Sequence, residues 1–340
     1  MRNQGVVHMS ESLAVWSGEI PYGKSEIEKD AAWRYSATRA DSLLDREFLR
    51  CCIHDCKELL RRRHRGQSPH FCPKHGISMS TKPTYIYRDA ERNFIIGKHI
   101  PKRLPKVENW RLGFETSEDA LSWNVFVSLY ALEGLAEVSA KLTGISPMEE
   151  PELYLWGNRI AAESGKWERL LDVRKTLEHG IAIPTEPDIM LRIPGQAIVL
   201  IEAKFGSPNS RLAGKKARFG SVNEFLNRYK CKEAATDPLN RTWISEQEDT
   251  MILEQLSRNA IFAHWLASGD EQPFLINLVT GKATNDEQLF RQHLAENGVK
   301  FHVQTWEELC GLSVVQGEQA SLLRRYLENK TLNLQPAFNL

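Results

Sequence analysis

The stretch that most constrains the fold is TEPDIMLRIPGQAIVLIEAKFGS, residues 185–207. It contains two apolar runs separated by Pro-Gly-Gln, and this pattern is typical of a hairpin of buried strands. If the strands fold back around Gly195, residues equally distant from that glycine lie opposite each other, and Asp188 and Glu202 form such a pair. A bulge or a different turn would shift this register. The segment therefore predicts an antiparallel pair of strands that brings two carboxylates together.

Three ionisable side chains, Asp188, Glu202 and Lys204, lie within or at the end of these apolar runs, where an unpaired charge is costly. Glu202 and Lys204 are two residues apart and so share one face of a strand. Opposite positions of an antiparallel pair lie about 4.5–5.5 Å apart, so two carboxylates there repel unless a cation lies between them. A hard divalent ion such as Mg²⁺ or Mn²⁺ suits such a pair. The lysine can then orient or deprotonate a water, or stabilise charge developing on a phosphate.

These residues, written as Pro187-Asp188 and Glu202-Ala203-Lys204, resemble the signature of the PD-(D/E)xK nuclease superfamily, which has the restriction-endonuclease-like fold. The resemblance covers roughly residues 115–310. It implies that Asp188 and Glu202 bind the catalytic metal and that Lys204 serves the nucleophilic water. The alternative is a strand-end salt bridge at the surface, worth only about 0–1 kcal/mol.

The resemblance also implies two further site residues on helices. Many members have an acid on the helix before the signature, and we assign it to Glu118 rather than to Glu115 or Asp119; a helix-dipole role is the alternative. Many members have a glutamine on the helix after the signature. Gln255 in LEQLSRNAIF fits this place, with Arg258 and Asn259 one turn further on, and a solvated helix position is the alternative.

Alternating helical and strand patterns predict an α/β domain over residues 111–340, with a central mixed sheet flanked by helices in the restriction-endonuclease-like arrangement. A helix is expected from Thr116 or Ser117 to about residue 142, and a second one over 164–180. A third helix is expected to begin at Ser245 and to end near Gly269. Further strands are expected over 273–281 and 300–306.

A cysteine cluster marks the N-terminal region, which we take as a separate part over residues 1–110 with a basic linker at its end. Cys52-x3-Cys56 and, after a loop, Cys72-x2-His75 have the spacing of a structural Zn²⁺ site, placed within about residues 50–80. The choice of Cys52 stays open, because one of three other residues can replace a ligand: Cys51, His54 or His70. Free buried cysteines are the alternative.

Two basic clusters are candidates for contact with nucleic-acid phosphates. One is the stretch 211–232 after the signature, represented by Lys215, Lys216 and Arg218. The other is Arg61, Arg62 and Arg63 in the loop of the zinc module. A solvated charged face is the alternative for both.

The sequence as a whole favours a Mg²⁺-dependent endodeoxyribonuclease acting on duplex DNA, in restriction, phage defence or mobile-element processing. The alternative is a non-cleaving DNA-binding or transposition component that uses the same scaffold and the zinc module. The chain has 340 residues, with 44 Lys and Arg against 44 Asp and Glu, so net charge identifies no partner. No apolar run reaches the ~20 residues of a membrane helix and no signal peptide is recognisable, so we expect a cytoplasmic bacterial or phage protein without a membrane partner. A homodimer or a protein partner stays open.

Overall fold

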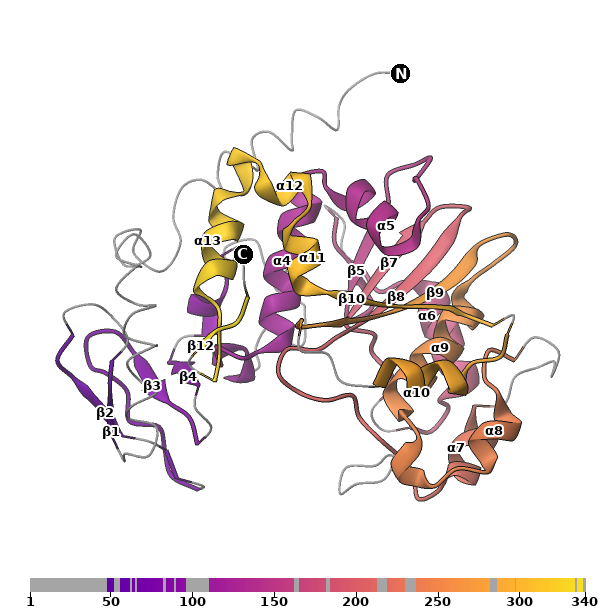
Figure 1. The fold of residues 1–340 in the computed structure, drawn as a ribbon, viewed down its shortest axis with the longest axis horizontal. Coiled ribbons are helices and arrows are strands. Elements are labelled where there is room, and N and C mark those ends of the chain that lie inside the picture. The colour runs from indigo at the N-terminus through magenta and orange to yellow at the C-terminus, as the bar shows by residue number, and fades with distance from the viewer. Residues whose placement is uncertain are drawn as a thin grey trace. The chain divides into compact units, whose positions relative to one another are not determined.

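A computed structural model describes most of the chain (Figure 1). The described residues are 48–51, 56–61, 63–64, 66–81, 84–88, 90–95, 110–161, 165–181, 184–212, 219–229, 237–281, 286–296, 298–333 and 335–338. Contacts divide the chain into two units: the first joins the residues up to Gly134 to Glu307–Leu340, and the second is Leu135–Trp306. The boundary expected at residue 110 adjoins residues 96–109, which lie outside the described residues, and it stays a prediction.

The second unit is built on a six-stranded sheet with the strand order β10-β9-β8-β7-β5-β6. Strands β8, β9 and β10 are parallel to one another, and the remaining pairs are antiparallel. The predicted α/β class with a mixed central sheet flanked by helices is confirmed; its restriction-endonuclease-like arrangement stays a prediction. The strands are β5 (Glu152–Leu155), β6 (Asn158–Arg159), β7 (Ile189–Ile193), β8 (Ala197–Ala203), β9 (Gln272–Val279) and β10 (Lys300–Thr305).

The hairpin of β7 and β8 has the register expected from the sequence. Ile189 lies opposite Ile201 and Ile193 lies opposite Ala197, so the chain folds back around Gly195. Gly195 has a φ of 67°, a left-handed conformation that glycine adopts without steric cost. Continued by one residue, this register sets Asp188 against Glu202.

One face of the sheet forms a hydrophobic core with two helices. A row of buried side chains crosses five strands and packs with α6 (Glu168–Leu177) and α9 (Glu254–Leu266), which lie against the sheet in Figure 1. Every residue of β8 is buried, as expected of a central strand with parallel pairing on one side. The row consists of Tyr154, Met190, Leu200, Leu275 and Phe301.

The prediction that a helix begins at Ser245 is wrong. Ser245 is the last residue of α8, which Asn240 caps by accepting a hydrogen bond from the Trp243 N–H. The chain then turns, and the fully buried Ile252 and Leu253 enter the core before α9 begins. The remaining helices of this unit are α5 (Leu135–Thr143), α7 (Val222–Arg228), α8 (Arg241–Ser245) and α10 (Asp286–His293), with the 3-10 turn η6 (Asp249–Met251).

The first unit contains α4 (Glu118–Ala131), which begins where the sequence predicts. Ser117 is its N-cap and accepts a hydrogen bond from the Ala120 N–H. The expected single helix to residue 142 is interrupted after α4, where Glu133 has a φ of 57°. The other elements are β1 (Phe48–Arg50), β2 (Leu59–Arg61), β3 (Ile77–Met79), β4 (Tyr85–Tyr87), η2 (Ala90–Asn93), η4 (Trp110–Gly113), α12 (Ser313–Gln316), η7 (Glu318–Ala320), α13 (Ser321–Asn329), β11 (Thr331–Leu332) and β12 (Gln335–Pro336). Helix α11 (Trp306–Cys310) belongs to this unit from its second residue on.

Candidate active site and metal centre

A buried ion pair lies at the carboxyl end of β8. Lys204 Nζ is 2.6 Å from Glu202 Oε1, and the two residues are only 7% and 1% exposed. The backbone of Lys204 is fixed on both sides, because its N–H donates to Leu278 O and its carbonyl accepts from the Trp306 indole N–H. Buried charges persist in proteins when they are paired and hydrogen-bonded, and this pair meets both conditions.

Helix α9 adds two amide side chains to the ion pair. Lys204 Nζ donates to Gln255 Oε1 at 3.1 Å, and Asn259 Nδ2 donates to Glu202 Oε2 at 2.8 Å. Gln255 and Asn259 are four residues apart and so lie on one face of the helix. The structure therefore brings Gln255 to Lys204, as the sequence analysis expects. Asn259 was named there only as a neighbour of Gln255, and its contact with Glu202 is an addition.

Asp188 lies half-buried at the start of β7, beside the same strand end. Its Oδ2 accepts a hydrogen bond of 3.1 Å from the Ala203 N–H, and its carbonyl accepts one from the Trp156 N–H. Asp188, Glu202 and Lys204 are thus gathered at one edge of the sheet. The arrangement offers oxygen ligands of the kind that Mg²⁺ or Mn²⁺ prefers, beside an ammonium group that already compensates one carboxylate.

A buried polar network holds the chain that leads to Asp188. The backbone N–H of Thr185 donates to Glu178 Oε2 at 2.6 Å, and its carbonyl accepts from Arg174 Nε at 2.8 Å. The Thr185 hydroxyl accepts a hydrogen bond of 2.5 Å from Arg258 on α9 and donates one to Glu178. The bond from Arg258 to Thr185 links α9 directly to the segment that precedes Asp188. Within α9, Arg258 also pairs with Glu254 at 2.7 Å.

Burial shifts the pKa of two ionisable groups in the network. Burial lowers the pKa of the Arg174 guanidinium, and burial raises the pKa of the Tyr229 hydroxyl, which donates to Glu178. No pattern in the sequence predicts this network. Arg258 in LEQLSRNAIF is its one visible signal, since Thr185 lies outside the regular patterns of the sequence.

Glu118, the expected third carboxylate ligand, belongs to the first unit and begins α4. Its part in the site stays a prediction. Glu115, which the sequence analysis set aside, is buried and engaged within the first unit: it accepts hydrogen bonds from the Tyr87 hydroxyl and the Thr331 N–H and lies 3.7 Å from Lys330 Nζ.

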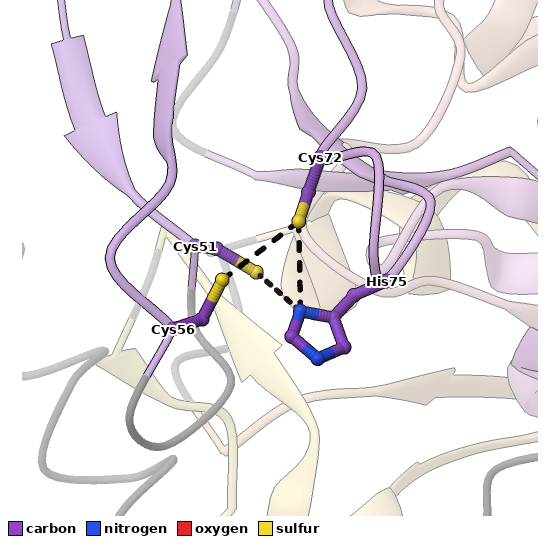
Figure 2. A group of neighbouring side chains, drawn as sticks. All are labelled: Cys51, Cys56, Cys72 and His75. Carbon is purple, nitrogen blue, oxygen red and sulfur yellow. Dashed lines mark hydrogen bonds between the residues drawn. The ribbon is translucent and has the colours of Figure 1, made fainter.

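A second centre lies in the first unit, where Cys51, Cys56, Cys72 and His75 converge with all four ligand atoms within 4.8 Å of one another (Figure 2). The Cys56 and Cys72 sulfurs are 3.8 Å apart, and His75 Nδ1 is 3.5 Å from the Cys51 and Cys72 sulfurs. Tetrahedral zinc bound by these ligands has edges of about 3.8 Å between sulfurs and about 3.6 Å between sulfur and nitrogen. The cluster therefore has the dimensions of a metal site such as that of zinc.

The ligand set corrects one expected residue. Cys51 takes the place for which the sequence analysis named Cys52, which lies outside the described residues. The second pair is as expected, and its knuckle is closed by hydrogen bonds from Gly76 N to Cys72 O and from Cys72 N to Ile77 O. Burial raises the pKa of the Cys56 thiol to about 12, so a metal must displace its proton.

The basic clusters are described only in part. Lys215, Lys216, Arg218 and Arg62 lie outside the described residues. Arg61 is exposed on β2, and Arg63 donates from Nε to Gln67 O at 2.7 Å. Their contact with nucleic acid stays a prediction.

Comparisons of the chain with protein-family models, curated proteins and solved structures found no match. The resemblance to the PD-(D/E)xK superfamily therefore depends on the residues and their arrangement alone. None of the helices in the described ranges combines the length and the apolar character that crossing a bilayer requires.

Proposed function

We propose that the protein is a metal-dependent nuclease that hydrolyses phosphodiester bonds in DNA. The observation that carries this proposal is the convergence of Lys204 with Glu202 and Gln255, next to Asp188, at the carboxyl end of β8. A structural salt bridge that is buried uses the two amides to complete its hydrogen bonds, but it does not need the second carboxylate, Asp188. A site for charge on a phosphate uses all of them.

Asp188 and Glu202 would hold Mg²⁺ or Mn²⁺. When bound, the ion polarises a phosphate oxygen and lowers the pKa of a bound water. Asn259 fixes the orientation of Glu202 through its hydrogen bond to Oε2. Lys204, whose ammonium Gln255 also contacts, turns from Glu202 toward the attacking water or the phosphate oxygen and stabilises the charge that develops there.

The second candidate function is a DNA-binding or assembly component that does not cut. It is favoured by the Cys51, Cys56, Cys72 and His75 cluster, because a zinc-stapled module beside Arg61 and Arg63 supplies a binding element independent of the carboxylates. In that case the ion pair of Lys204 and Glu202 stabilises the carboxyl end of β8 and has no catalytic role.

The test is cleavage of plasmid, linear duplex and single-stranded DNA with Mg²⁺ or Mn²⁺. Wild type is compared with Asp188→Ala and Lys204→Ala, and with Lys175→Ala as the matched control. The Lys175 side chain is 78% exposed and, among the described residues, pairs with Asp172 on its own helix. Cutting that is lost in the two site variants and kept in the control supports the nuclease. Cutting that survives in both site variants rejects this site, and DNA binding without cutting by wild type favours the second candidate.

A further inference from the structure

Asn277 on β9 is a buried side chain whose carbonyl oxygen has no hydrogen-bond partner. The residue is 3% exposed, and its Oδ1 is one of the buried polar atoms that remain unsatisfied among the described residues. Buried side-chain oxygens are nearly always hydrogen-bonded, because desolvation without a partner is unfavourable. The unpaired oxygen is therefore available to a ligand or a bound water that the chain itself does not supply.

Asn277 lies next to the candidate active site. It is the Cα partner of Glu202 in the parallel pairing of β8 with β9, and residues in register on adjacent strands project from the same face. Asp188 lies opposite Glu202 on the other side, one residue beyond the last paired position of β7. Three oxygen-bearing side chains thus form a row across β7, β8 and β9 at one end of the sheet.

We propose that Asn277 Oδ1 is an additional oxygen ligand, direct or through a bound water, of the divalent cation held by Asp188 and Glu202. This inference rests on the proposed function. A hard cation accepts amide carbonyl oxygens together with carboxylates, and an uncharged third ligand adds coordination without further repulsion between acids. It also explains why β9 carries a polar side chain at Asn277. Two residues earlier on the same face, Leu275 belongs to the hydrophobic row.

The test is Mn²⁺ binding to the zinc-loaded full chain, measured by electron paramagnetic resonance, with thermal unfolding of the Mn²⁺-free protein as a second readout. Asn277→Leu should raise the Kd for Mn²⁺ at least tenfold, about 1.4 kcal/mol, and at the same time raise the Tm, because an unpaired buried amide is replaced by an apolar group. Asn277→Asp should lower the Kd and keeps the inference testable if the leucine variant does not fold.

Gln304→Leu is the matched control. Gln304 Oε1 is also buried without a partner, and Gln304 follows Val303, the β10 partner of Asn277, so it lies on the opposite face of the sheet. This variant should leave the Kd for Mn²⁺ unchanged. An unchanged Kd in Asn277→Leu, or no tightening in Asn277→Asp, overturns the inference while the proposed nuclease site stands. Absence of saturable Mn²⁺ binding by wild type overturns both.

Discussion

Lys204 Nζ lies 2.6 Å from Glu202 Oε1 in a part of the second unit from which solvent is almost excluded. The Lys204 ammonium is therefore the counter-ion of Glu202, the carboxylate that we propose as a metal ligand. A divalent cation bound there would release Lys204 from Glu202 and leave it available to a phosphate. Gln255, which already contacts Lys204, can hold the ammonium during that change.

Substitutions of Lys204 and Glu202 should have strongly non-additive effects on the free energy of unfolding. Lys204→Met removes the charge but keeps the length of the side chain, and it leaves the Glu202 carboxylate buried without its partner. We expect a loss of about 3–5 kcal/mol in the free energy of unfolding, measured in urea without divalent ions. The double variant Lys204→Met with Glu202→Leu should recover much of that loss.

The control for this cycle is Lys175→Met. Its pairing with Asp172 is highly exposed, and such pairs contribute at most about 1 kcal/mol. Additive effects of the Lys204 and Glu202 substitutions would show that the two side chains do not interact in solution as described.

Thr185 should position Asp188. Thr185→Val keeps the shape of the side chain but removes the hydroxyl between Arg258 and Glu178. Buried polar groups left unpaired cost about 1–3 kcal/mol, so we expect this loss in stability and at least a tenfold weaker Mn²⁺ affinity. Thr176→Val is the control, because that hydroxyl is exposed and donates to Asp172 O on its own helix. Wild-type Mn²⁺ affinity in Thr185→Val would show that the hydrogen bonds of Thr185 do not position Asp188.

His293 should make folding sensitive to acid. Its Nε2 accepts a hydrogen bond from the N–H of Leu253, the N-cap residue of α9, and Nδ1 is 2.9 Å from Leu289 O. Burial, with a further contribution from the Arg211 charge, lowers its pKa to about 4, against about 6.5 in the unfolded chain. Between these values the unfolded state binds more protons, so stability falls as pH decreases from about 6.5 to 4.

The size of this effect is at most about 3.5 kcal/mol, because each pKa unit corresponds to about 1.4 kcal/mol. The measurement is the free energy of unfolding at several pH values for wild type and His293→Gln. Glutamine can still accept the hydrogen bond but does not titrate, so its profile should be flatter in this window. Parallel profiles would contradict the assignment.

Metal content should distinguish Cys51 from Cys52. Purified protein should hold one zinc per chain, which a strong chelator removes. Cys51→Ser and Cys72→Ser should lose it, whereas Cys52→Ser should retain it, as measured by atomic emission. Zinc loss in Cys52→Ser alone would restore the ligand expected from spacing.

The sequence was informative where local rules determine structure. The Pro-Gly-Gln turn and the two apolar runs determine the hairpin register, and the two-residue period places Glu202 and Lys204 on one face. The place of Gln255 followed from the resemblance, which implies a glutamine on the helix after the signature. Ser245 failed as a helix start because burial of Ile252 and Leu253 outweighs a local capping preference.

Other features depend on long-range contacts that no local pattern reveals. Asn277 is unremarkable within an apolar strand until parallel pairing sets it beside Glu202. Thr185 and Glu178 meet only after α6 and the following loop are in place. Adjacent cysteines satisfy the same spacing rule almost equally, so spacing alone does not decide between Cys51 and Cys52.

The most direct test of the central claim is single-turnover cleavage of supercoiled plasmid by Glu202→Gln in Mg²⁺. The substitution preserves the size of the side chain but removes the buried negative charge. Our account predicts that wild type cuts, that the variant is at least a hundredfold slower, and that its circular dichroism spectrum is unchanged. Cutting at the wild-type rate by the folded variant would contradict a metal-dependent nuclease site at Glu202.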